Sequence, residues 1–183
     1  MSRSCQVFNA SLLFENSLLP SRLVELVNSG ERVLVSGSGG VGKSMLLRAA
    51  FPEKPILLLN HLTNAMSITH DEFESGSCFL IDDAHRFNEK QTEWVVSCLN
   101  RLKRGYVISF PQARIPRTAP IIEYSLSIKL TLALQQERGH VIRIFLDGDW
   151  GGEIVWAEQV IQAKDGKINI LSEIKPNPDN FTA

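Results

Sequence analysis

The sequence predicts an α/β fold: a three-layer core with a mainly parallel sheet, followed by an antiparallel, β-rich C-terminal segment. Three observations lead to this prediction. Short apolar runs alternate with helical patterns through the first two thirds of the chain. Of the 183 residues, 44% are apolar and 21% are charged, which is typical of a globular domain with a sizeable core. In the last third, apolar and polar residues alternate with the period of two that favours strands.

The pattern divides the chain into three segments. Residues 1–118 carry the alternating strands and helices after an irregular lead-in, and residues 119–175 form the β-rich extension. The Pro- and Asn-rich residues 176–183 are predicted to be a flexible tail. At roughly 150 residues per domain, this length favours one domain with little room for a second.

Charge and cysteine content exclude several classes of protein. The net charge of −1, from 19 Lys+Arg and 20 Asp+Glu, argues against a nucleic-acid binder that works by bulk charge and leaves a local basic patch open. Cys5, Cys78 and Cys98 are an odd number without metal-ligand spacing, so we expect free thiols in a reducing compartment. No signal peptide or membrane-spanning run is present, which predicts a cytoplasmic protein without membrane association.

The elements of the core follow from apolar periodicity and end signals. A helix over residues 21–29 has an apolar face and ends at Gly30, a residue suited to the left-handed conformation that follows a helix. A second helix is predicted over residues 45–50, and a third after Asn88, a suitable N-cap. Buried strands are predicted at residues 32–36, 56–59, 78–81 and 106–110.

The pattern changes after the proline-marked residues 111–120. Seven apolar residues occupy alternate positions from Ile122 to Leu134, which predicts a strand with its even-numbered side chains buried. A further strand is expected over residues 141–146. Asp165-Gly166 separates two more apolar runs and is a strong hairpin signal. We therefore expect the last third to be antiparallel β.

A glycine-rich motif follows the first predicted strand directly and leads into a helix. Residues 37–44 match G-x-x-x-x-G-K-S, the Walker A pattern, in which glycines let backbone N–H groups curl around phosphate oxygens. Lys43 places a charge at the β- and γ-phosphates, and the Ser44 hydroxyl can ligate Mg²⁺. The motif predicts a bound nucleotide and Mg²⁺, held by Gly37, Ser38, Gly39, Gly40, Val41, Gly42, Lys43 and Ser44.

A second motif is an apolar strand that ends in two carboxylates, Asp82 and Asp83. In P-loop enzymes a strand beside the glycine loop delivers an Asp to the Mg²⁺ shell, and Asp82 is placed for this role. Asp83 can then orient and polarise the attacking water. The predicted metal ligands are therefore Ser44 and Asp82, and the predicted catalytic residues are Lys43 and Asp83. A strand that simply ends in an Asp-rich turn is the alternative.

Together with the glycine loop, residues 79–87 resemble the ATPase core of the AAA+ class, and look most like bacterial replication initiators and their regulatory relatives. The resemblance covers about Gly30 to Pro116. It implies a P-loop NTPase core over residues 1–118, with ATP and Mg²⁺ as cofactors and Asp82 and Asp83 as the Walker B pair. The chain departs from the class at Asp83, where most members have Glu, and in the predicted strands where the class has a helical lid.

The resemblance also implies a γ-phosphate sensor at the end of the fourth strand, where Ser109 and Gln112 are both candidates. Arg114 and Arg117 follow closely and are candidate arginine fingers to a neighbouring subunit, since Arg suits phosphate recognition. The alternative is that these two arginines are solvated loop residues.

These motifs predict an ATP-binding protein that hydrolyses ATP with Mg²⁺ to drive a conformational or assembly switch. A GTPase switch is an alternative, although the chain lacks Asn-Lys-x-Asp for guanine and its only comparable D-x-x-G, residues 149–152, comes late. A nucleotide-responsive adaptor with little turnover is another. The sequence leaves open whether the chain forms a homo-oligomer or binds a protein partner.

Overall fold

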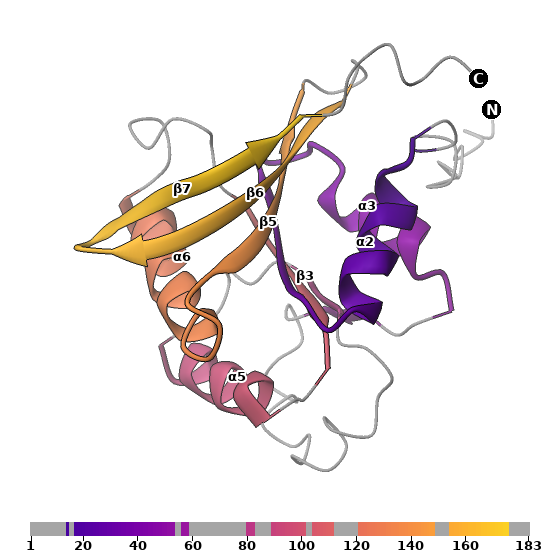
Figure 1. Ribbon diagram of the computed structural model, residues 1–183. Helices are drawn as coiled ribbons and strands as arrows, with labels where there is room; N and C mark the ends of the chain where they lie inside the picture. The colour runs from indigo at the N-terminus through magenta and orange to yellow at the C-terminus, as the bar shows by residue number, and fades with distance from the viewer. Residues whose placement is uncertain are drawn as a thin grey trace, which may run out of the picture.

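The computed structural model describes residues 14, 17–53, 56–58, 80–82, 89–101, 104–111, 121–148 and 154–175. One seven-stranded sheet, in the order β2-β3-β4-β1-β5-β6-β7, organises them (Figure 1). The strands are β1 Arg32–Gly37, β2 Ile56–Leu58, β3 Leu80–Asp82, β4 Tyr106–Pro111, β5 Val141–Asp147, β6 Val155–Lys164 and β7 Lys167–Ile174. The helices are α2 Leu19–Asn28, α3 Lys43–Ala50, α5 Glu89–Arg101 and α6 Ile121–Leu134.

The sheet is parallel from β2 through β5 and antiparallel from β5 through β7. β1 lies between β4 and β5 and is parallel to both, with Gly37 opposite Pro111 on one side and Leu146 on the other. All residues of β1 are buried, as expected for a parallel strand covered on both faces. The prediction of a mixed α/β fold with a partly parallel sheet is confirmed.

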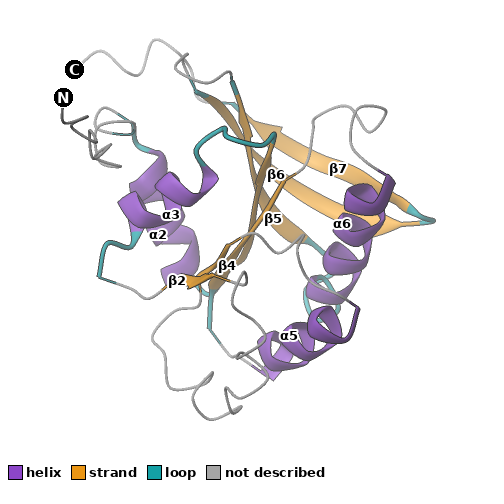
Figure 2. Ribbon diagram, turned by 180° about the vertical axis from the view of Figure 1, so that it is seen from behind, coloured by secondary structure: helices purple, strands orange, loops and turns teal. Residues whose placement is uncertain are grey.

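Helices lie on both sides of this sheet. Figures 1 and 2 show α2 and α3 on one side and α5 and α6 on the other. The α2–α3 side contains an apolar cluster, to which alternate residues of β1 and β5 contribute because successive side chains point to opposite faces. Its buried members include Leu19, Leu23, Val33, Val35, Leu46, Leu47, Ile142, Ile144 and Leu146.

The most important correction to the sequence analysis concerns residues 122–134, which form helix α6 and not a strand. Ser127, Leu130, Thr131 and Leu134 are buried at the helical spacing i, i+3, i+4, i+7, whereas Leu132 is 44% exposed. The two buried hydroxyl residues are compatible with this packing; for example, the Thr131 hydroxyl donates to the Ser127 carbonyl at 2.8 Å.

The reason for the helix is topological. β4 and β5 flank β1 and are parallel, so the chain must return across the sheet between them, and such crossovers are usually helical. The end of α6 is held by Arg32 of β1, whose guanidinium donates to the Leu134 carbonyl at 3.0 Å and to Glu137 at 2.6 Å. A cation at this position also compensates the negative end of the helix dipole.

The C-terminal strands are partly as predicted. β5 is parallel to β1, so the expectation that the whole last third is antiparallel was wrong, and only the β6–β7 hairpin extends the sheet in antiparallel fashion. The hairpin itself is confirmed. Asp165 and Gly166 form its turn with φ of 53° and 69°, as a two-residue type I′ turn requires. The division of the chain at residues 118 and 175 stays a prediction.

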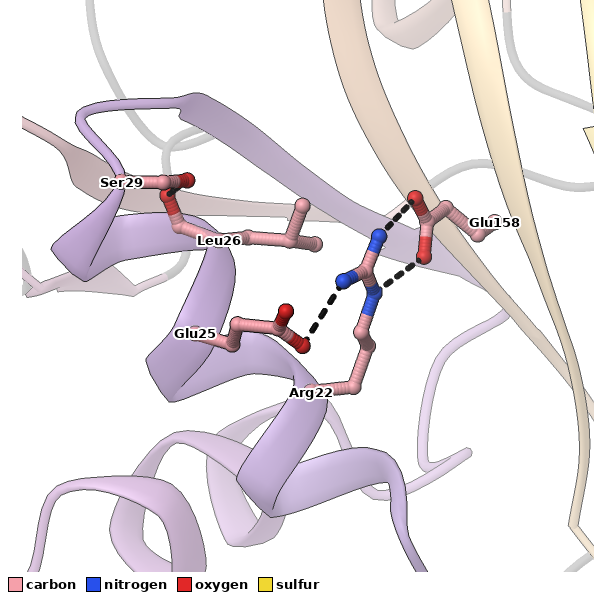
Figure 3. Close-up of polar contacts among 5 residues, drawn as sticks. All are labelled: Arg22, Glu25, Leu26, Ser29 and Glu158. Atoms are coloured by element: carbon pink, nitrogen blue, oxygen red, sulfur yellow. Dashed lines mark hydrogen bonds and ion pairs between the residues drawn. The ribbon is translucent and has the colours of Figure 1, made fainter.

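The hairpin is attached to the first helix by a charged contact (Figure 3). Arg22 of α2 donates from two nitrogens to the two carboxylate oxygens of Glu158 on β6, at 2.8 and 2.9 Å, and from the third to Glu25 at 2.8 Å. The Glu158 side chain is only 11% exposed. The hydrogen bond to Glu158, followed by that to Glu25, raises the pKa of Arg22 above its ordinary value. Bidentate geometry of this kind holds α2 against the hairpin.

Two substitutions in α6 separate the helix from the predicted strand. Leu130→Asp places a charge in a fully buried position, so we expect a loss of about 3–5 kcal/mol in the free energy of unfolding. Leu132→Asp faces solvent in the helix and should cost about 1 kcal/mol or less. Urea unfolding of both variants measures the two free energies of unfolding. If the segment were a strand with its even-numbered side chains buried, both substitutions would lower the free energy of unfolding by a similar amount.

Candidate functional site

The predicted phosphate-binding loop lies at the carboxyl end of β1, between the ends of β4 and β5, and leads into α3. Gly40 and Gly42 have φ of 77° and 98°, which L side chains rarely adopt. The Val41 side chain is buried in the apolar cluster and anchors the loop from below, while residues 38–40 are exposed. The loop therefore presents backbone to solvent on a fixed base.

Gly37 is required by its neighbour on β5. A Cβ atom at this position would lie 2.4 Å from the Leu146 carbonyl oxygen, and the φ of Gly37 is 151°. The first glycine of the motif therefore allows β1 and β5 to pair at the point where the loop begins. At Gly39, in contrast, a Cβ atom would meet nothing within 4 Å.

Lys43 is the first residue of α3, and only 7% of it is exposed. Its ammonium group donates to the Gly37 carbonyl at 3.1 Å and to the Ser38 carbonyl at 2.7 Å, so it lies inside the loop. The structure therefore places the charge of Lys43 inside the glycine loop, at the amino end of α3.

The amino end of α3 adds donors to the same place. Gly42 is the N-cap and has no side chain with which to satisfy the first N–H groups of the helix, and the first turn contains no acidic residue. Half-buried Ser44 lies in this turn next to Lys43. A helix amino terminus with these properties favours an anion.

Asp82 ends β3, which is not the strand beside the loop, because β4 lies between β3 and β1. The pairing of Ile81 with Ile108 puts Asp82 next to Ser109, which in turn is paired with Val35. Two strand spacings correspond to about 9–10 Å between the backbones of β3 and β1.

Ser109 lies on β4 between these two strands and is fully buried. Its partner Val35 belongs to the cluster under α2 and α3, so Ser109 lies on the sheet face that α3 covers. Of the two sensor candidates, Ser109 can therefore be placed at the α3 face. Gln112 lies outside the described residues, as do Asp83, Arg114, Arg117, Cys5 and Cys78.

A further carboxylate, Asp147, lies at this edge of the sheet and was not predicted from the sequence. Asp147 follows Leu146, the partner of Gly37, and so ends the strand directly beside β1. It is exposed, and its Oδ1 accepts a hydrogen bond from the Gly148 N–H at 3.1 Å. A lone Asp before a Gly is typical of a turn, so the sequence contains no signal that separates it from other turn residues.

Cys98 is buried and is not part of a disulfide. Among the described residues no group of three or more His, Cys, Asp or Glu side chains is arranged to hold a metal ion. The helices in this part of the chain are all too short or too polar to cross a membrane.

No family model and no curated protein matches this sequence. Among solved structures, AMPPCP-bound DnaA from Aquifex aeolicus is similar with 18% identity and a TM-score of 0.45, over 56% of this chain and 38% of that chain. A structure described as a DNA replication initiation factor has 18% identity and a TM-score of 0.40, over 60% of this chain and 40% of that one. The chain therefore spans about two fifths of each of these proteins.

The two loop glycines provide a matched pair for testing the geometry of the site. Gly37→Ala forces a Cβ against a backbone oxygen of β5 and should lower the free energy of unfolding by about 1–3 kcal/mol. Gly39→Ala meets open space and should change it by less than about 0.5 kcal/mol. Equal stability of the two variants in a denaturant titration would contradict the close approach of the loop to Leu146.

Proposed function

We propose that this chain is an ATP-binding P-loop protein that hydrolyses ATP with Mg²⁺ and uses the nucleotide state to switch its conformation or assembly. The proposal includes a P-loop NTPase core of the AAA+ class. The observation that carries it is the buried Lys43 ammonium group inside a glycine loop at the amino end of α3. The strand, loop and helix that surround it have the order expected of a phosphate-binding loop.

Each residue of the site has a proposed role. The loop N–H groups and Lys43 bind the phosphates, and Lys43 stabilises the charge that develops on the γ-phosphoryl group. Ser44 and Asp82 hold Mg²⁺, which contributes neutralising charge when bound. Asp83 polarises the attacking water, and Ser109 or Gln112 senses the γ-phosphate. Arg114 and Arg117 are the candidate arginine fingers, which would reach the nucleotide of a neighbouring subunit.

Binding is tested by removing the charge of Lys43. We expect ATP with Mg²⁺ to raise the melting temperature of the wild-type chain, since a ligand at about 100 times its Kd adds about 2.7 kcal/mol of stability. Lys43→Ala should lose most of this shift. Arg48→Ala, which removes an exposed charge from the same helix, should keep it. A thermal-shift series with ATP, ADP, GTP and GDP makes the measurement.

The same series separates the alternatives for the nucleotide. A larger shift with GTP and GDP than with ATP and ADP would favour the GTPase alternative. No shift with any of the four nucleotides at millimolar concentration, in a wild-type chain that unfolds cooperatively, would contradict the proposal.

Hydrolysis is tested by neutralising the carboxylates at the strand ends. Asp83→Asn keeps the shape of the side chain and should lower single-turnover ATP hydrolysis by ~10²-fold while ATP still binds. Asp82→Asn should in addition weaken the part of ATP binding that depends on Mg²⁺. Asp147→Asn is the matched control at the neighbouring strand end and should leave both unchanged.

The ATP affinities and hydrolysis rates of these variants distinguish the proposed roles of the carboxylates. If Asp147→Asn impairs Mg²⁺-dependent binding and Asp82→Asn does not, the metal ligand has been assigned to the wrong strand. If the wild-type chain binds ATP and shows no turnover, the nucleotide-responsive adaptor is the better description.

A further inference from the structure

The strand β6 begins at the edge of the sheet where β1 and β5 end, because it runs antiparallel to β5. Leu146 of β5 pairs with Gly37 on one side and with Trp156 on the other, so these three residues form one row across the sheet. Two strand spacings correspond to about 9–10 Å between the backbones of β1 and β6. Trp156 therefore lies two strands from the start of the glycine loop, on the side away from β4.

The side chain of Trp156 lies on the sheet face that α3 covers. It packs against the apolar cluster to which both Leu146 and Val41 belong, and Val41 is the residue that anchors the glycine loop. Phe14 and Phe51 are buried members of the same cluster, whereas Trp156 is only partly buried. Among the described aromatic residues of this face, Trp156 is therefore the most exposed.

The indole N–H of Trp156 has no hydrogen-bond partner within the described part of the chain, although its nitrogen is buried. A buried Trp N–H ordinarily finds an acceptor, because leaving this donor unpaired is unfavourable. No hydrogen bond of this N–H therefore fixes the ring in its present orientation, and a ligand that supplies an acceptor can bind the donor when the ring turns.

The proposed nucleotide site fixes the direction in which a bound nucleotide extends, and the inference rests on that proposed function. Asp82 and Ser109, the proposed contacts of Mg²⁺ and the γ-phosphate, lie on β3 and β4, to one side of β1. A phosphate chain that runs from the loop toward these strands leaves the nucleoside on the opposite side. That side leads over β5 to Trp156 on β6.

We propose that the base of the bound nucleotide stacks against Trp156, which makes β6 part of the nucleotide site. An indole ring offers a large flat surface with a polar N–H at its edge, and a base offers a flat face with acceptor nitrogens at its edge. The separation of two strands between the loop and Trp156 is of the same order as the length of a nucleoside. Because every base has a face that can stack, this contact adds affinity without distinguishing adenine from guanine.

The stacking contact is tested by comparing a ligand that has a base with one that does not. ADP and inorganic pyrophosphate, each with Mg²⁺, both offer the loop two linked phosphates, and ATP hydrolysis consumes neither. Trp156→Leu keeps an apolar side chain without a ring, so the Kd for ADP should rise about 5- to 150-fold, the range for losing one stacked base. The Kd for pyrophosphate should stay at its wild-type value. Isothermal titration calorimetry measures both constants.

Three control variants separate stacking from other effects. Trp156→Phe retains an aromatic face and should recover most of the ADP affinity that Trp156→Leu loses. Trp94→Phe changes a partly buried residue of α5, on the other side of the sheet, and should bind ADP like the wild type (Figures 1 and 2). Lys43→Ala should lose both ADP and pyrophosphate, because its charge acts on the phosphates. Far-UV circular dichroism of each variant shows whether it is folded.

A fluorescence measurement tests the same contact with Trp156 in place, and so does not depend on the folding of Trp156→Leu. In a chain with Trp94→Phe and Trp150→Phe, Trp156 is the one remaining tryptophan, and its emission is observed alone. Stacking on a base should quench this emission as ADP is added, with a midpoint at the Kd from calorimetry. Pyrophosphate should leave the emission largely unchanged.

The results also distinguish failure of this proposal from failure of the proposed function. If the wild-type chain binds both ligands and folded Trp156→Leu binds ADP equally well, the loop is a phosphate site and the base does not contact Trp156. If Trp156→Leu loses pyrophosphate together with ADP, or if pyrophosphate quenches Trp156 as strongly as ADP does, Trp156 acts on the loop and the stacking proposal is overturned. If the wild-type chain binds neither ligand, the proposed function fails and this proposal fails with it.

Discussion

The structure depends on one constraint: β1 is buried along its whole length between two strands that are parallel to it. Parallel neighbours require the chain to cross back over the sheet after β4, and α6 makes this crossover. The same arrangement brings the carboxyl ends of β4, β1 and β5 to one edge, where the glycine loop begins. Close pairing with Leu146 at this edge then leaves no room for a side chain at position 37.

Three buried cationic side chains, Arg32, Lys43 and Arg143, lie on or near β1 and differ in their hydrogen-bond partners. The guanidinium of Arg32 donates to the Leu134 carbonyl at the carboxyl end of α6 and to the Glu137 carboxylate, so its charge has partners within the fold. Arg143 on β5 is also buried, and desolvation lowers its pKa to about 10, against the opposing influence of Glu173. The Lys43 ammonium group donates to the Gly37 and Ser38 carbonyls, so its hydrogen bonds hold the glycine loop against the start of α3.

The two flanks of the sheet make different contacts with the rest of the fold. The central strands position the loop, and the short parallel strands β2 and β3 bring Asp82 to the same edge, with β4 between it and the loop. The β6–β7 hairpin lies on the opposite flank, attached to α2 through Arg22 and Glu158. Because α2 leads directly into β1, this contact links the hairpin to the strand that ends at the glycine loop.

The sequence by itself determined the features that depend on local chemistry. Backbone conformation at Gly40, Gly42, Asp165 and Gly166 follows from residue type, so the loop and the hairpin turn were predictable. The buried runs that form β1, β4 and β5 were also evident, since short β-branched segments between turn signals have few alternatives.

Only the tertiary structure decided the state of residues 121–134 and the neighbours of each strand. Alternating apolar residues in this segment fit a strand, but Ser127 and Thr131 can be buried on a helix by using backbone carbonyls, and the crossover between parallel strands selects the helix. The order of the strands in the sheet also cannot be predicted from the local sequence pattern. The separation of Asp82 from the loop by β4, and the approach of Asp147 from β5, arise from pairing between segments far apart in the chain.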